Sequence, residues 1–379
     1  MFSIWKTTDM EENKSFQKLR IPELDGLRGI AILLVVSFHY INNQLVHTPG
    51  KFTNFLYKAT SFGWIGVDLF FVLSGFLIGN ILFKNITSPR FYKVFYMRRL
   101  LRIVPNYFLL VTAYAIIITI PYFSGSSFIA GNNIIPLWSY YTMIHNFFMA
   151  SYKNMGNPSM SVTWSIGIEE QFYLIFPFII MFIKREFLPV VLLLIVIAAS
   201  LFRSLYSSWI PGYVLINCRM DSLSCGILVA YLVNTNDLNV LIHKYYFHLI
   251  ILLLVVVTIC SSLYFLYNDL GPAKQTLFSI FFSVLLIFSL HQKDSLFRAF
   301  LRNNLLCWIG TISYSLYLFH YLILGLFHYV ISGNTFIGIQ TIKDVWVSLA
   351  ALATTLLFSW VVFKKIETPF VIYGKRYRY

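Results

Sequence analysis

Apolar segments long enough to cross a lipid bilayer recur along the whole chain. A helix needs about 20 mainly apolar residues to span the hydrocarbon core, and only 12% of this sequence is charged. A soluble domain of average composition carries about twice that charged fraction. Backbone polar groups must pair internally in lipid, so spans of this kind form helices. The sequence therefore predicts an all-α fold, a polytopic transmembrane helical bundle in a single domain.

We predict about ten spans joined by short connections. Residues 136–150 are rich in aromatic side chains, but the segment is short for a membrane-spanning helix. We therefore expect an interfacial or re-entrant segment there. The length leaves room for one membrane domain at 21–370, between a polar segment at 1–20 and a basic tail at 371–379. The expected spans lie near 28–46, 65–83, 100–122, 166–183, 188–203, 219–234, 247–267, 276–290, 305–331 and 345–363.

Lysine and arginine are distributed unevenly between the predicted connections. With a cytoplasmic N-terminus, 22 of the 29 lie in inside segments and five in outside segments. Cytoplasmic loops carry such an excess. Both termini are therefore expected in the cytoplasm, and the chain is expected in the plasma (cell inner) membrane as a multi-pass protein. The same excess accounts for the net charge of +14 without a nucleic-acid partner. The polar N-terminus lacks the features of a cleaved signal peptide, so we expect it to stay attached.

The first predicted span carries two ionisable side chains. Arg28 stands near its start and His39 lies eleven residues further on. That separation is about three helical turns, so both side chains point the same way, about 16 Å apart along the helix axis. Ionisable groups inside a membrane are costly and mark candidate functional sites. Histidine also suits general-base work near neutral pH, although His39 could instead form a hydrogen bond between helices.

Further polar side chains cluster at the predicted ends of other spans. An arginine cluster at the cytoplasmic start of the third span could bind phosphate groups or anchor the topology. The remaining groups could bind a substrate or form ion pairs and caps within the bundle. These candidates are Asp25; Asp68 and Ser74; Arg98, Arg99 and Arg102; Glu169 and Glu170; Arg219 and Asp221; and His320, within the span predicted at 305–331. The four cysteines have neither metal-ligand nor redox spacing, so no metal site is predicted.

Seven segments, in the same order, resemble the motifs of the acyltransferase-3 family of integral membrane acyltransferases. The resemblance runs nearly from end to end of the chain. It places the family's first-span arginine and histidine at Arg28 and His39, its Arg-x-x-Arg pair at Arg99 and Arg102, and its glutamate at Glu169. The segments are LDGLRGIAILLVVSFH, GVDLFFVLSGFLI, RRLLRIVPNY, TWSIGIEEQFYLIFP, RMDSLSCG, ISYSLYLFH (ending at His320) and KKIETPF.

The resemblance implies transfer of an acyl group, usually acetyl, to a hydroxyl of a carbohydrate acceptor such as a surface polysaccharide or lipid-linked glycan. Acyl-CoA would be the co-substrate, with no bound cofactor, and Arg98, Arg99 and Arg102 would bind it. His39 would act as base or as transient acyl carrier, and Glu169 would fix its tautomer or hold the acceptor. Many relatives carry a C-terminal extracytoplasmic hydrolase-like domain. This chain shows no such segment before Tyr379, so we expect the membrane domain to work alone or with a separate partner.

The main alternative is a proton-coupled transporter or glycan flippase. Intramembrane arginine, histidine and carboxylate groups serve such carriers as well. The lysines and arginines of the cytoplasmic segments would then only set the orientation of the chain in the membrane. No pair of matching halves with interrupted helices is visible in the sequence, which favours the acyltransferase interpretation.

Overall fold

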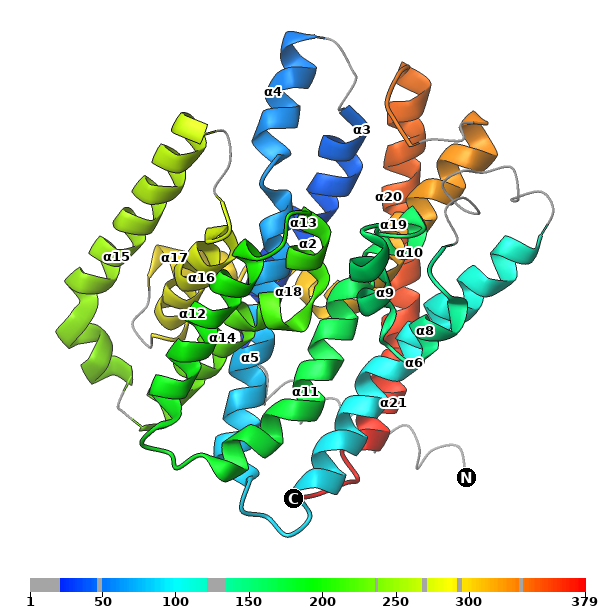
Figure 1. The fold of residues 1–379 in the computed structure, drawn as a ribbon. Helices are drawn as coiled ribbons and strands as arrows, with labels where there is room; N and C mark the ends of the chain where they lie inside the picture. Colours follow the sequence, from blue (N-terminus) through cyan, green and yellow to red (C-terminus); the bar gives the residue numbers. More distant parts are fainter. Residues whose placement is uncertain are drawn as a thin grey trace.

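All regular structure in the described part of the chain is helical, as predicted (Figure 1). The computed structural model describes residues 21–45, 50–120, 134–235, 238–267, 271–291, 295–333 and 337–379. The predicted N-terminal segment, residues 1–20, lies outside these ranges. Within them, eight helical segments are long and apolar enough to cross a membrane, and two shorter apolar helices accompany them. The chain is therefore a multi-pass membrane protein.

The long helices overlap every predicted span, although α6 and α15 each begin nine residues before the predicted start. The two shorter apolar helices, α12 and α16, coincide with the spans expected at 188–203 and 276–290. The principal helices are α2 (Pro22–Ser37), α5 (Gly66–Asn85), α6 (Phe91–Thr119), α11 (Trp164–Phe182), α12 (Leu188–Ser204), α14 (Ile216–Thr235), α15 (Leu238–Tyr267), α16 (Lys274–Leu290), α19 (Ser313–Phe327) and α20 (Ile342–Val362).

Short helices connect the long ones and cover their ends. The aromatic stretch at 136–150 forms two of them, and neither is long enough to span a membrane, as expected. The short helices are α3 (Asn43–Leu45), α4 (Lys51–Thr60), α8 (Leu137–Tyr141), α9 (His145–Tyr152), α10 (Pro158–Ser161), α13 (Trp209–Val214), α17 (Leu296–Leu301), α18 (Asn304–Thr311) and α21 (Thr368–Gly374).

The single span predicted at 305–331 is wrong in one respect, because the helix breaks at Ile312. Its backbone leaves the regular helical conformation, with φ −91° and ψ 4°. The segment before the break, α18, packs against α2, whereas α19 packs against α20. Gly310 of α18 lies so close to α2 that a Cβ there would overlap the backbone oxygen of Asp25. A continuous helix could not make both contacts, and hydropathy does not register the break.

Glycines allow α5 and α14 to pack at very short distance. A Cβ at Gly75 would overlap the backbone oxygen of Leu223, and a Cβ at Gly226 would overlap that of Val72. Small residues let helix backbones approach in this way inside membranes. The glycines of the second span therefore allow its close packing against α14.

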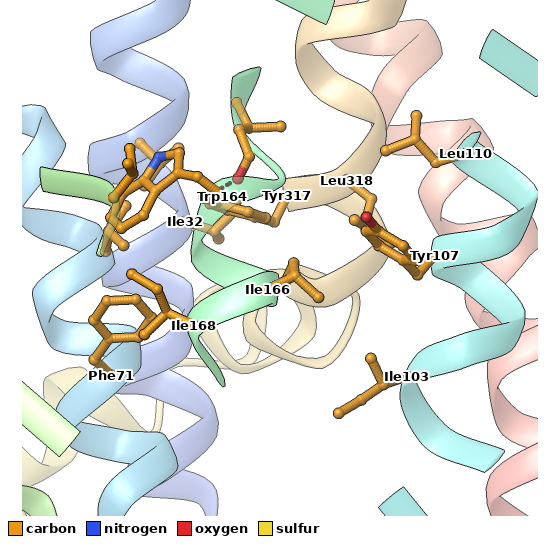
Figure 2. Packing of buried hydrophobic residues seen from close by; sticks show 14 of the residues in the cluster. Ile32, Phe71, Ile103, Tyr107, Leu110, Trp164, Ile166, Ile168, Tyr317 and Leu318 are labelled. Carbon is orange, nitrogen blue, oxygen red and sulfur yellow. Dashed lines mark hydrogen bonds between the residues drawn. The ribbon is translucent and has the colours of Figure 1, made fainter. Parts of the chain in front are cut away.

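Helix α11 lies at the centre of the apolar core. Figure 2 shows its Ile166 between Phe71 of α5 on one side and Tyr107 of α6 on the other. All three side chains are at least 95% buried. The core thus joins the α2–α5 side of the bundle to the α6 side, and α11 carries its polar residues between them.

Three turns of π-helix interrupt the described helices. They cover Phe38–Asn42 after α2, His328–Ser332 after α19 and Phe363–Glu367 after α20. Such turns are rare and occur often at functional sites. Two of them carry an ionisable residue that borders a cavity, His39 and Glu367. Figure 1 shows α4 at one edge of the bundle and α21 at the other; that the α21 edge faces the cytoplasm stays a prediction.

Candidate functional site

A cavity near α21 is bordered by three arginines and two carboxylates, and we call it the basic mouth. Its volume is about 270 Å³. Arg28 of α2 and both Arg99 and Arg102 of α6 border it. Arg28 also lies 3.4 Å from the carboxylate of Asp25. The rest of the lining is Ile21, Leu24, Asp25, Leu77, Ile81, Phe363, Glu367, Thr368 and Val371.

A second cavity, the central cavity, continues from the basic mouth into the bundle. Its volume is about 120 Å³. The two cavities share Arg28, Leu77, Arg99, Arg102 and Glu367 in their linings, so they adjoin. The predicted residues Ser74 and Glu169 also border the central cavity. The structure therefore brings together candidates from four helices, α2, α5, α6 and α11.

Arg99 and Glu169 are linked through Tyr173. The Arg99 guanidinium lies 5.0 Å from the centre of the Tyr173 ring, a cation–π contact. The Tyr173 hydroxyl donates a hydrogen bond of 2.8 Å to Glu169 Oε1. Because the Arg99 side chain is largely buried, these contacts hold its guanidinium at the cavity wall. Tyr173 lies in the segment that resembles the family, but the sequence alone assigned it no role.

Glu367 is a site residue that the sequence analysis missed. It borders both the basic mouth and the central cavity. Its Oε2 accepts hydrogen bonds of 3.1 Å from Asn106 Nδ2 and from Ser315 Oγ. This residue belongs to the KKIETPF segment, whose position in the motif order was the available signal. What the motif does not reveal is that the π-turn brings this carboxylate beside arginines of α2 and α6.

Beyond the central cavity lies a larger one with a volume of about 440 Å³, which we call the aromatic cavity. The two adjoin at Val67 and Tyr317, which border both. The Tyr317 hydroxyl donates 2.9 Å to the Val162 oxygen and lies 2.7 Å from Ser165 Oγ. Tyr317 is therefore held in place at the boundary. The remaining lining is Val35, Phe38, His39, Asn43, Trp64, Met155, Gly156, Pro158, Ser161, Val162, Trp164, Trp209, Tyr213, Lys274 and Tyr321.

His39 borders the aromatic cavity from the π-turn that follows α2. Its Nδ1 lies 3.0 Å from the Val35 oxygen and 3.1 Å from Nε2 of His320 on α19. Its ring also packs on Tyr321, with ring centres 4.4 Å apart. Among the described residues, the predicted candidate in contact with the His39 ring is thus His320, whereas Glu169 bonds to Tyr173.

Three of the acidic and basic candidates, Asp68, Arg219 and Asp221, form a buried ion-pair network that does not itself border the three cavities. Arg219 of α14 lies 2.8 Å from Asp68 of α5, and both side chains are fully buried. Arg203 of α12 lies 2.9 Å from Asp221 of α14. The Arg219 guanidinium also lies within 5.5 Å of three ring centres, those of Phe71, Trp164 and Tyr213. This network ties together the helices behind the aromatic cavity.

Two further candidates do not border the three cavities. Arg98 Nε and Nη2 donate hydrogen bonds of 2.9 and 2.6 Å to the Tyr377 oxygen. The Arg98 guanidinium also lies 5.0 Å from the centre of the Tyr379 ring. Arg98 thus faces the C-terminal segment, unlike Arg99 and Arg102 on the same helix. Glu170 has a buried carboxylate oxygen that accepts no hydrogen bond from the described residues.

Known proteins resemble this chain over nearly its full length. The profile of a family described as an acyltransferase domain (Acyl_transf_3) matches residues 21–364. Peptidoglycan O-acetyltransferase OatA of Listeria monocytogenes is 27% identical over 95% of this chain and 57% of its own length. O-acetyltransferase OatA of Staphylococcus aureus is 27% identical over 94% of this chain and 59% of its own length. The chain thus spans less than two thirds of these relatives, and no solved structure matches it.

We predict that the Asp68–Arg219 pair stabilises the fold. Either Asp68→Asn or Arg219→Met leaves one buried partner unpaired, which costs about 3–5 kcal/mol. Both variants should therefore lower the melting temperature of the purified protein strongly. The double variant Asp68→Leu with Arg219→Met should lose less than the sum of the single changes. Glu186→Gln, at an exposed carboxylate, is the control and should melt close to the parent. Parent-like melting of Asp68→Asn would contradict the structural role.

Proposed function

The chain belongs to the acyltransferase-3 family of membrane acyltransferases, and we propose that it transfers an acyl group from cytoplasmic acyl-CoA to a hydroxyl of a carbohydrate. The observation that most supports this function is the series of three adjoining cavities. Shared lining residues connect a basic mouth, a central cavity and an aromatic cavity. The first suits a phosphorylated donor, and the last borders a histidine and suits a sugar. Acetyl is the proposed acyl group, because the matched relatives are named O-acetyltransferases.

The donor end of the reaction is assigned to the basic mouth. Acyl-CoA carries several phosphate groups, and planar guanidinium groups bind phosphate through paired hydrogen bonds. Arg28, Arg99 and Arg102 supply three guanidinium groups around one cavity. The pantetheine arm is long and thin, so it could extend through the central cavity toward Tyr317. The thioester would then come close to the boundary with the aromatic cavity.

The acceptor end is assigned to the aromatic cavity. Sugar rings present faces of C–H groups that pack against aromatic side chains, while their hydroxyls form hydrogen bonds. Three tryptophans, Trp64, Trp164 and Trp209, border this cavity together with tyrosines and Asn43. A carbohydrate hydroxyl placed there would lie beside His39. One relative is named for peptidoglycan, which makes a cell-wall or related surface glycan the first acceptor to test.

The reaction moves one proton in two steps, from the acceptor hydroxyl to His39 and then from His39 to the leaving thiolate. As the acceptor hydroxyl attacks the thioester carbonyl, neutral His39 takes the hydroxyl proton. The new ester bond forms, the carbon–sulfur bond breaks, and the leaving thiolate receives the proton from His39 to give CoA. A general base of this kind contributes about 100- to 10,000-fold in rate. Direct transfer requires no acyl-histidine intermediate, so we assign His39 as base rather than acyl carrier.

Covalent transfer separates this proposal from the transporter alternative. Purified protein in liposomes is given acetyl-CoA labelled in the acetyl group, together with cell-surface glycan fractions as acceptor. We expect label in the glycan that mild alkali releases as acetate, because the product is an ester. Movement of glycan or protons across the liposome membrane without labelled product would overturn the proposal in favour of a carrier.

We predict that His39→Gln removes transfer and leaves donor binding intact. Glutamine keeps polar contacts but cannot accept a proton near neutral pH, so the rate should fall by about 100-fold or more. Binding is followed through the rise in melting temperature on adding acetyl-CoA, which should match the parent. Transfer near the parent rate in a folded His39→Gln variant would show that His39 is not the base.

We predict that Arg99 and Arg102 act on the donor and that Arg98 does not. Arg99→Ala and Arg102→Ala should each raise KM for acetyl-CoA, by about tenfold or more if one charge-assisted contact is lost. Lysine at either position should restore binding poorly, because the planar fork is absent. Arg98→Ala is the matched control, since this side chain faces the C-terminal segment. Equal rises in KM for all three variants would contradict the assignment.

A further inference from the structure

The hydrogen bonds of His320 determine which of its ring nitrogens carries the proton. Its Nδ1 lies 2.7 Å from the Tyr317 oxygen and 3.1 Å from the Leu316 oxygen. Carbonyl oxygens only accept hydrogen bonds, so Nδ1 must be the donor. In a neutral imidazole the other nitrogen then carries a lone pair. His320 Nε2 is therefore an acceptor.

His320 Nε2 and the Val35 oxygen together set the tautomer of His39. His320 Nε2 lies 3.1 Å from His39 Nδ1, and the Val35 oxygen lies 3.0 Å from the same atom. Both neighbours of His39 Nδ1 are acceptors, so Nδ1 carries the hydrogen. The free lone pair of neutral His39 is then on Nε2. This is the ring nitrogen that can take a proton from an acceptor hydroxyl in the adjoining cavity.

We propose that His320 is a positioning residue that holds His39 in the tautomer with Nδ1–H and a bare Nε2. The inference rests on the proposed function, in which His39 is the base. A backbone carbonyl, the His320 ring and the His39 ring form one chain of hydrogen bonds in a fixed direction. The hydrogen bond that one ring nitrogen of a histidine makes commonly sets which nitrogen is free to react.

The surroundings of His320 support a positioning role. The side chain is fully buried, and its backbone oxygen accepts a hydrogen bond of 3.0 Å from the Tyr40 hydroxyl. The same hydroxyl lies 3.0 Å from Thr355 Oγ1 on α20. His320 is thus held from two helices. Its neutral ring can also stabilise a protonated His39 through the Nε2 lone pair, without placing a second charge in the bundle.

His320 takes over a role that the sequence interpretation gave to Glu169. Glu169 borders the central cavity and accepts a hydrogen bond from Tyr173. In the described residues, the side chain that meets His39 Nδ1 is His320. The two histidines are 281 positions apart in the sequence, which explains why spacing along the chain could not show this contact.

The tautomer can be observed directly by nitrogen NMR of protein labelled with ¹⁵N-histidine. The His39 signals are assigned from their loss in His39→Gln. We expect a protonated Nδ1 and an unprotonated Nε2 in the parent. An Nε2-protonated His39 in the parent would overturn the proposal. This readout needs no acceptor or activity, so it stands apart from a failure of the proposed function, which would show as absent acyl transfer.

Variants of His320 test the consequence for catalysis. His320→Leu removes the Nε2 acceptor at His39 Nδ1. We therefore expect kcat to fall by about 10- to 100-fold, the range seen for groups that orient a metal-binding histidine. KM for acetyl-CoA should stay unchanged. His320→Gln can still present a carbonyl oxygen at that reach and should retain most of kcat, whereas the shorter His320→Asn should not.

His328→Leu is the matched control. His328 is also buried on the same helical segment, but it bonds to Ser348 and does not border the three cavities. Its loss should leave kcat unchanged. Parent-like kcat in folded His320→Leu would overturn the proposal, as would equal kcat in the Gln and Asn variants. If His320→Leu does not fold, the comparison of His320→Gln with His320→Asn and the NMR spectrum of the parent still test the positioning role of His320.

Discussion

The free-energy cost of leaving a charge in hydrocarbon governs where the ionisable side chains of this protein lie. Some are paired within the bundle, as in the buried Asp68–Arg219 contact. Others border cavities, as Arg99 and Arg102 do. The two solutions serve different purposes. Paired charges hold helices α5, α12 and α14 together, and cavity charges are available to a substrate. This division identifies the candidate site more clearly than a count of intramembrane charges could.

The backbone supports the same division. Close glycine contacts bring α5 and α14 together, so that the paired charges meet. Elsewhere, a π-helical turn presents His39 to one cavity, and another presents Glu367 to the next. Irregular backbone inside a membrane protein is tolerated where it borders a cavity or is buried in protein. Two of the three π-helical turns in the described residues therefore fall where the proposed chemistry needs side chains inside the bundle.

Much of this arrangement was predictable from sequence, for physical reasons. Hydropathy reports the length of each span, so the ten apolar helices were expected close to their observed positions. Arg28 and His39 both border cavities, as their spacing suggested, although they border different ones. Contacts between distant segments were not predictable. Periodicity cannot show that Arg98 turns to the C-terminal segment while Arg99 faces the mouth, that the helix breaks at Ile312, or that His320 meets His39.

The central claim is that the acyl group passes from a donor at one face to an acceptor at the other through adjoining cavities. Sealed vesicles of one orientation test this most directly. Acetyl-CoA labelled in the acetyl group is supplied only at the cytoplasmic face, and a membrane-impermeant glycan acceptor only at the opposite face. The account predicts labelled glycan on the side opposite the donor. Label that reaches the glycan only when both substrates share the cytoplasmic side would contradict it.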